Sequence, residues 1–235
     1  MKIMKAALIV SIALNVLLVG AAAFYIQMNG GERFLKTQWR ALTSDQPFND
    51  YYLNQKSVFE AASADAPVDK VFIGDSLTDH GQFGEYFPGE TVINRGIRDD
   101  TSYNVLHRIK EVAEREPKEA YILVGINDIM EGIGPEEYEK NVRKIVGAFD
   151  HGKTEVTLFS ILPVNHDLIG NSIRDEEIAK YNGILRKVAE ESGADLIDLH
   201  PAFLDDKGQL DQRYTIDGVH LNGAGYDVWM EKMKR

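Results

Sequence analysis

From Val68 to the end of the chain, short apolar runs alternate with longer segments of helical periodicity. Apolar runs without polar alternation are typical of strands that are buried on both faces of a sheet. The predicted strands are Val71–Ile73, Thr91–Ile93, Ala120–Val124, Val156–Ile161 and Leu196–Leu199, and the predicted helices are Ser102–Glu116, Pro135–Phe149, Asp175–Ser192 and Ala224–Lys234. Strands separated by helices predict a parallel sheet covered by helices on both faces, which is an α/β domain.

Three residues follow the ends of the first three predicted strands. Ser76 comes after the first strand, Gly96 after the second and Asn127 after the third. Ligands of open parallel sheets bind at the carboxyl ends of the strands. We therefore expect these three residues to lie along one edge of the sheet, where a functional site would form.

Ser76 lies where the first strand should give way to a turn, and near the other end of the chain Asp217 precedes His220 by three residues. A hydroxyl is a weak nucleophile until a base accepts its proton, and a carboxylate that orients an imidazole makes it a better base. The three residues are therefore candidates for nucleophile, base and orienting carboxylate. Taken alone, Ser76 also fits a helix N-cap, and Asp217 fits an ordinary Asp-Gly turn.

Four segments, in this order along the chain, resemble the SGNH or GDSL hydrolase family. They are Gly74-Asp75-Ser76-Leu77, Asn94-Arg95-Gly96, Gly125-Ile126-Asn127-Asp128 and Asp217-Gly218-Val219-His220. The resemblance runs from Val68 to Trp229. It implies a flavodoxin-like, three-layer α/β/α sheet and a serine hydrolase that cleaves carboxylic esters through an acyl-serine intermediate, without a metal or a cofactor.

The same resemblance implies a role for each site residue. Ser76 would be the nucleophile, His220 the base and Asp217 the residue that orients the base. The oxyanion of the tetrahedral intermediate would be bound by the backbone N–H groups of Ser76 and Gly96 and by the side-chain amide of Asn127. Donors placed in this way stabilise the charge that develops in the transition state.

Two further residues are candidates for substrate contacts. Arg98 follows the second strand, where many family members carry a small residue, and would either contact an anionic substrate or pair with Asp99 or Asp100. His166 lies in the loop after the fourth strand and would border the pocket. The sequence does not decide whether either residue contacts substrate.

Several aspartates lie close to the candidate site in the sequence. They are Asp75, Asp79, Asp99, Asp100 and Asp128. Their spacing matches no calcium-binding loop, so a metal site is not expected. We expect these carboxylates to have structural roles in turns.

The N-terminus predicts a membrane-spanning helix. Lys2 and Lys5 precede an apolar run from Ala6 to Ile26, which is long enough to cross a bilayer. Positive residues on this side favour an N-terminus inside and a catalytic domain outside the cytoplasm. The alternative is a secreted protein whose signal peptide is cleaved near Ala21-Ala22-Ala23, although the apolar run continues beyond that point.

Composition narrows the possible partners. The net charge of −11 argues against non-specific attraction to nucleic acid or to anionic lipid headgroups. The sequence contains no cysteine, which excludes disulfides, thiol catalysis and cysteine-based zinc sites. The oligomeric state cannot be read from the sequence.

We expect three parts along the chain: a signal anchor or signal peptide at 1–28, a juxtamembrane helical connector at 29–66 and the hydrolase domain at 67–235. The connector contains scattered aromatic residues, namely Phe34, Trp39, Phe48, Tyr51, Tyr52 and Phe59. At such irregular spacing, aromatic side chains usually cover an edge of a core, and this is our expectation here.

The favoured function is hydrolysis of short acyl esters, acetyl above all, on carbohydrate or envelope substrates. Lysophospholipids or other acyl lipids are the second possibility. The same acyl-enzyme would also serve an O-acyltransferase, if a sugar hydroxyl replaced water as the acceptor. A carbohydrate-binding or assembly protein that keeps the fold without turnover is the non-enzymatic alternative.

Overall fold

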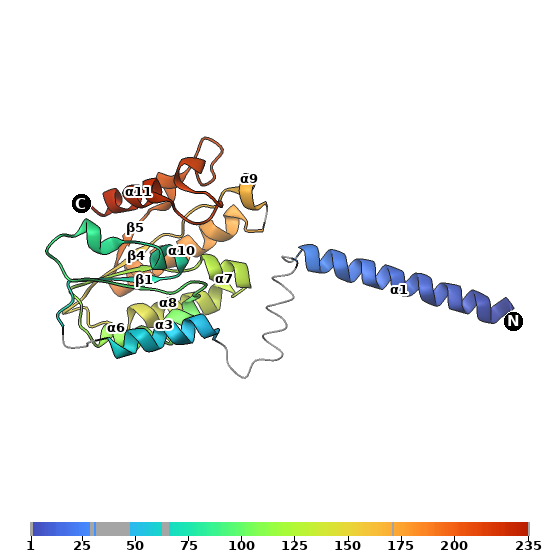
Figure 1. The fold of residues 1–235 in the computed structure, drawn as a ribbon, viewed down its shortest axis with the longest axis horizontal. Coiled ribbons are helices and arrows are strands. Elements are labelled where there is room, and N and C mark those ends of the chain that lie inside the picture. Colours follow the sequence, from blue (N-terminus) through green and yellow to red (C-terminus); the bar gives the residue numbers. More distant parts are fainter. Residues whose placement is uncertain (1, 29–30, 32–47, 63–65, 171, 235) are drawn as a thin grey trace. The chain divides into compact units, whose positions relative to one another are not determined.

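Five parallel strands form one sheet in the computed structural model, which describes residues 2–28, 31, 48–62, 66–170 and 172–234 (Figure 1). The strands are β1 (Lys70–Gly74), β2 (Val92–Gly96), β3 (Glu119–Leu123), β4 (Glu155–Phe159) and β5 (Asp195–Ile197). Their spatial order is β2-β1-β3-β4-β5, and every neighbouring pair is parallel. This is the flavodoxin-like order, and the predicted three-layer α/β/α fold is confirmed.

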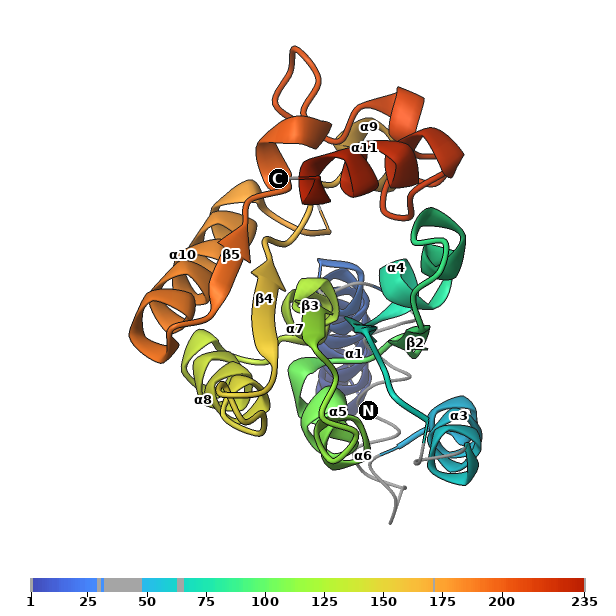
Figure 2. The same ribbon diagram turned by 90° about the vertical axis from the view of Figure 1, so that its left-hand side faces the viewer.

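Alternate residues of each strand point to opposite faces of the sheet, and each face has its own apolar core. Val71 and Ile73 face one core, which is covered by α5 (Ser102–Leu106), α6 (Ile109–Ala113), α8 (Pro135–Val146) and α10 (Asp175–Ser192). Phe72 faces the other core, which is covered by α11 (Gly223–Met233) with the 3₁₀ turns η1 (Phe83–Tyr86) and η2 (His200–Phe203). Figure 2 shows α8 and α10 on one side of the strands and α11 on the other. Burial on both faces explains why the strands read as continuous apolar runs.

The continuous helix predicted over Ser102–Glu116 is wrong. The structure has two short helices, α5 and α6, which are separated at His107 and Arg108. Arg108 leaves the helical conformation with φ −129°, and its buried guanidinium donates to Asp100 and to the carbonyl of Gly74. Both short helices still bury apolar residues in the same core, so the apolar periodicity of the sequence continues across the break and does not reveal it. The other predicted helices are present as α8, α10 and α11.

Residues of the predicted connector pack onto the unit that contains the sheet. The chain divides into two compact units after Pro47, and α3 (Asp50–Ala61) belongs to the second. Tyr52 is 1% exposed, stacks on Phe48 at 4.4 Å and donates its hydroxyl to the carbonyl of Asn104. α3 is therefore a packed element of the sheet-containing unit. Phe34 and Trp39 lie outside the described residues.

The first unit contains the long helix α1 (Lys2–Met28). Its segment Ser11–Met28 has a mean hydropathy of 1.7 and is long and apolar enough to cross a membrane. By length and composition, α1 is able to serve as a signal anchor or as a signal peptide.

Short helical turns follow the strands at their carboxyl ends. α4 (Ser76–Asp79) follows β1, α7 (Ile126–Glu131) follows β3, and α9 (His166–Ile169) lies after β4. A further 3₁₀ turn, η3 (Gln212–Tyr214), precedes the Asp217–His220 segment. Turns this short carry no periodic signal in the sequence, yet they position most of the candidate site.

Candidate active site

Ser76, His220 and Asp217 form a chain of hydrogen bonds, although the first two are 144 residues apart. The Oγ atom of Ser76 lies 2.9 Å from Nε2 of His220, and Nδ1 of His220 lies 2.6 Å from Oδ2 of Asp217. A carboxylate only accepts, so its contact assigns the ring proton to Nδ1 and leaves Nε2 to accept from the serine. This is the order of contacts that a Ser–His–Asp hydrolase requires.

The turn from β1 into α4 positions the hydroxyl of Ser76. Asp75 is the N-cap of α4 and accepts a hydrogen bond from the N–H of Leu77 at 2.9 Å. A side chain at Gly74 would place its Cβ 2.1 Å from the carbonyl oxygen of Leu123, so only glycine permits this approach of β1 to β3. The N–H of Ser76 lies at the first position of α4, where a helix has no partner of its own for that donor.

The segment that carries His220 is shaped by its own aspartate. Oδ1 of Asp217 accepts the backbone N–H groups of Val219 and His220, at 3.0 and 2.8 Å. Gly218 has φ +90°, which favours glycine, and a Cβ there would also meet Leu168 and other atoms of the α9 region. The Asp-Gly pair therefore forms a tight turn that directs the His220 ring toward Ser76.

The carboxyl group of Asp217 is ionised over a wide pH range. Its partial burial alone would raise the pKa, but the hydrogen bonds from the side chain and backbone of His220 and from the backbone of Val219 outweigh that effect. Together they lower the pKa of Asp217 to about 2. The residue paired with His220 is thus a carboxylate at neutral pH.

The three predicted oxyanion donors differ in what they bind. The N–H of Gly96 donates to Oδ1 of Asn94 at 2.7 Å, and a Cβ on Gly96 would lie 2.1 Å from the backbone nitrogen of Asp79. Gly96 therefore serves close packing of β2 against α4, and its N–H is already engaged. Nδ2 of Asn127 donates to the carbonyl of Asp100 at 2.9 Å, which orients the amide and leaves its second hydrogen available.

Three of the five aspartates expected to have structural roles in turns are fully buried, and one of them, Asp75, caps the α4 turn. Asp75, Asp100 and Asp128 each have 0% exposure. Asp100 pairs with Arg108 at 2.8 Å, and Asp128 accepts from the N–H and the hydroxyl of Ser102 at 2.9 and 2.5 Å. Asp75 has one carboxyl oxygen without a partner among the described residues. A turn prediction based on sequence missed this burial because the neighbours of these residues come from distant segments.

Burial controls the ionisation of this cluster. It raises the pKa of Asp75 to about 8, and the nearby Asp100 and Asp128 add to the effect, which the hydrogen bond from Leu77 opposes. Burial also raises the pKa of Asp100 to about 6 against the attraction of Arg108, and that of Asp128 to about 6 against the hydrogen bonds from Ser102. Asp75 is therefore largely protonated at neutral pH.

The remaining two aspartates of the set lie at the surface of the site. Asp79 is half-buried and accepts a hydrogen bond from the hydroxyl of Tyr51 at 3.0 Å. Asp99 is exposed and has φ +64°, in the left-handed region that non-glycine residues rarely occupy. The turn role predicted for these aspartates agrees with the backbone of Asp99.

The two candidate substrate contacts, Arg98 and His166, have protein partners. The guanidinium of Arg98 lies 5.0 Å from the centre of the Tyr51 ring, while Asp100 pairs with Arg108 and not with Arg98. Nε2 of His166 lies 2.8 Å from Asp175, and the hydrogen bond to this carboxylate raises the pKa of His166. The α9 turn that carries His166 packs against Gly218, so it supports the His220 segment from behind.

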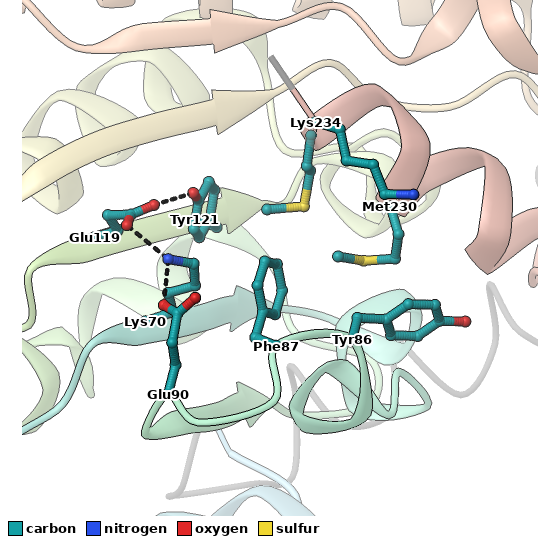
Figure 3. A pocket seen from close by; sticks show the side chains of 9 residues that line it. Lys70, Tyr86, Phe87, Glu90, Glu119, Tyr121, Met230 and Lys234 are labelled. Carbon is teal, nitrogen blue, oxygen red and sulfur yellow. Dashed lines mark hydrogen bonds and ion pairs between the residues drawn. The ribbon is translucent and has the colours of Figure 1, made fainter.

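A hollow of about 290 Å³ lies at the opposite edge of the sheet (Figure 3). Lys70 and Glu119 begin β1 and β3, so the hollow is at the amino ends of the strands. Its lining residues are Lys70, Tyr86, Phe87, Glu90, Glu119, Tyr121, Met230, Met233 and Lys234. Lys70 is held there between Glu90 and Glu119, at 2.6 and 2.7 Å. This hollow is separate from the Ser76 site.

Three residues that shape the site received no role from the sequence. Asn94 holds the end of α4 by donating to the carbonyls of Thr78 and Gly81. Arg108 lies beneath Gly74, and His80 places its ring 5.2 Å from that of His220. The position of His80, four residues after Ser76, was a usable signal, because residues four apart share a helix face. Nothing in the sequence marks Arg108 as buried.

The chain matches the model of the GDSL-like lipase/acylhydrolase family over residues 72–228. It is 26% identical, over 194 residues, to platelet-activating factor acetylhydrolase IB subunit alpha2 of Rattus norvegicus, covering 76% of this chain and 80% of that protein. It is also 24% identical to N-acylneuraminate cytidylyltransferase of Streptococcus agalactiae over 68% of this chain, but spans only 36% of that protein's length.

Solved structures agree with this result. A putative acylhydrolase from Bacteroides fragilis superposes with a TM-score of 0.69 at 26% identity, covering 80% of this chain and 96% of that one. An acetylxylan esterase from Geobacillus stearothermophilus shares the fold, with a TM-score of 0.59 at 20% identity over 72% of this chain and 93% of that one.

Proposed function

The chain belongs to the GDSL-like lipase/acylhydrolase family, and within that esterase chemistry we propose that it removes short acyl groups, acetyl above all, with Ser76 as nucleophile. The observation that carries the proposal is the continuous contact from Ser76 through His220 to Asp217. A serine whose proton has an acceptor at 2.9 Å, itself backed by a carboxylate, is able to attack an ester carbonyl at neutral pH.

The reaction has two halves. In the first, Oγ of Ser76 attacks the carbonyl carbon while Nε2 of His220 takes its proton, and that proton then passes to the departing alkoxide. In the second, a water molecule gives a proton to His220 and attacks the acyl-serine, which releases the acid and restores Ser76. Asp217 keeps Nδ1 protonated and stabilises the imidazolium in both halves.

The oxyanion is bound by two donors in this proposal. The N–H of Ser76 at the start of α4 is one, and the free hydrogen of the Asn127 amide is the other. Gly96 is left out of this role because its N–H is bonded to Asn94. The Asp100 carbonyl holds the Asn127 amide in place before substrate binds, so little reorganisation is needed in the transition state.

An acetyl group on a carbohydrate is the favoured substrate. Two of the similar proteins carry the acetyl group in their names, as an acetylhydrolase and as an acetylxylan esterase. The apolar helix α1 supports a location outside the cytoplasm, where envelope carbohydrate is found. Lys2 and Lys5 at its start favour the N-terminus inside and the catalytic unit outside.

An acyl-lipid substrate is the second candidate, because the site has apolar side chains at its border. Ile216, directly before Asp217, is 84% exposed, and Leu168, which packs near Gly218, is 47% exposed. Exposed apolar residues beside a catalytic residue are suited to contact an acyl chain. The acetyl proposal requires that these residues contribute little to turnover.

An ester series tests both candidates. The full chain in a mild detergent, with Ser76→Ala as its control, is assayed on p-nitrophenyl esters from acetate to dodecanoate, on acetylated xylo-oligosaccharides and on a lysophospholipid. We expect turnover that requires Ser76, falls with chain length and extends to the acetylated sugar. A preference for long-chain esters and for the lysophospholipid would make an acyl lipid the favoured substrate in place of an acetylated carbohydrate. Undiminished activity of a folded Ser76→Ala variant would refute the mechanism.

A further inference from the structure

We propose that His80 is a positioning residue that keeps the imidazole of His220 directed at Ser76. The inference rests on the proposed function, in which His220 is the base. His80 contacts no reacting atom in this scheme and acts only through the ring of His220.

His80 comes from the same turn of helix as the proposed nucleophile. Its N–H donates to the carbonyl of Ser76 at 3.1 Å, which places it one helical turn further on. The centre of its ring lies 5.2 Å from that of His220, with 46° between the two planes. The α4 turn therefore presents two groups to His220: the hydroxyl that binds Nε2 and a second imidazole that packs beside the ring.

His220 needs such support because its own surroundings are open. Its side chain is 36% exposed, and that of Asp217 is 53% exposed. Asp217 belongs to the same turn as His220, so its hydrogen bond does not tie the ring to the rest of the site. His80 contacts the ring from another part of the chain and restricts rotation away from Ser76.

The α4 turn that carries His80 is itself held in place by hydrogen bonds from other elements. The amide of Asn94 donates to the carbonyls of Thr78 and Gly81, at 2.7 and 2.9 Å, on either side of His80. The hydroxyl of Tyr226, in α11, donates to the carbonyl of Leu77 at 2.7 Å. Because α11 begins just after His220, this bond fixes the α4 turn relative to the segment that carries the base.

Two substitutions and a matched control test the proposal on the full chain in detergent. His80→Ala removes the ring, and His80→Phe keeps an aromatic ring without its nitrogens. His107→Ala is the control, because His107 is also an exposed histidine in ring contact, at 4.1 Å, but with Tyr103. The readouts are kcat and KM for p-nitrophenyl acetate and the rate of labelling of Ser76 by a fluorophosphonate, which has no alcohol group to recognise.

We expect His80→Ala to lower kcat about tenfold, with little change in KM, and to slow fluorophosphonate labelling by a similar factor. His80→Phe should recover most of both rates, and His107→Ala should match the wild type. Wild-type kinetics in His80→Ala would overturn the inference. A change in KM alone with normal labelling would also overturn it, since His80 would then contact substrate. Normal turnover in Ser76→Ala or His220→Ala would instead refute the proposed function.

Discussion

Asp217 and Asp75 both belong to the candidate site, and their surroundings shift their pKa values in opposite directions. Asp217 is in an open turn, 53% exposed, where donated hydrogen bonds lower its pKa to about 2. Asp75, the N-cap directly before Ser76, is fully buried, and desolvation raises its pKa to about 8. The residue types are the same and the sequence contexts are similar, since each is followed by a turn.

The difference shows that hydrogen-bond donors and access to water, rather than proximity to the serine, decide the charge on each carboxyl group. Around Asp217 the donors are sufficient to stabilise a carboxylate, which the proposed base, His220, requires. Asp75, Asp100 and Asp128 are all fully buried, and within the described part of the chain only Asp100 pairs with a cation, Arg108, so full ionisation of all three is unfavourable. In the proposed mechanism the exposed side of the site, around Asp217, therefore supports catalysis with a charge, whereas the buried side, around Asp75, Asp100 and Asp128, supports the fold with partly protonated groups.

The largest effect should come from removing the charge on the exposed side. Asp217→Asn is expected to lower kcat/KM by about 10⁴-fold, because the amide no longer selects the tautomer that leaves Nε2 free to accept. Thermal unfolding should change far less than activity, since the side chain is 53% exposed and the amide oxygen of asparagine is still able to accept from the backbone of Val219 and His220. Asp198→Asn, also at an exposed aspartate, serves as the control and should keep full activity. Less than a tenfold loss would show that the two sides do not differ as described.

The next effect should appear in stability on the buried side. Arg108→Met leaves Asp100 without its cation and should lower the free energy of unfolding by about 3–5 kcal/mol. Arg174→Met, which breaks the exposed pair with Glu177, is the matched control and should change stability little. Urea unfolding of both variants gives the comparison. Equal losses would mean that burial is not what distinguishes the two ion pairs.

Asn127 connects the proposed oxyanion site to the buried carboxyl cluster, since its amide donates to the backbone carbonyl of buried Asp100. Asn127→Ala should lower kcat by about 10²–10³-fold with little effect on KM, because the lost donor acts on the oxyanion. Asn127→Asp, which keeps the volume and removes the donors, should be impaired to a similar degree. A change confined to KM would exclude Asn127 from the oxyanion site.

The smallest effect is on the pH dependence of stability. The pKa of Asp75 is raised on folding, so its contribution to stability is complete below its unfolded value of about 4 and is lost as the pH rises toward 8. Asp217 has the opposite sign, and its contribution is lost as the pH falls from about 4 toward 2. Between pH 5 and pH 8, Asp75→Asn should therefore remove on the order of 3 kcal/mol of the stability loss that the wild type shows.

The change in unfolding stability between pH 5 and pH 8 is measured from urea unfolding curves at the two pH values. Asp211→Asn is the control, because its carboxyl group has a pKa lowered by Arg213 and should not contribute in this range. Identical slopes in the wild type and Asp75→Asn would contradict the burial-driven ionisation of Asp75.

The sequence by itself determined the α/β fold, the strand candidates and the family, because burial on two faces and the four motifs are local patterns of residue type. It also placed Ser76, Gly96 and Asn127 at the carboxyl ends of strands. Only the tertiary structure decided that Gly96 has its N–H occupied by Asn94, that Arg108 interrupts a helix to reach Asp100, and that His80 packs on His220. The Gly96–Asn94 bond is local but depends on the side-chain conformation of Asn94, which no pattern of residue types specifies. The burial of Arg108 beside Gly74 and the packing of His80 on His220 depend on contacts between segments distant along the chain.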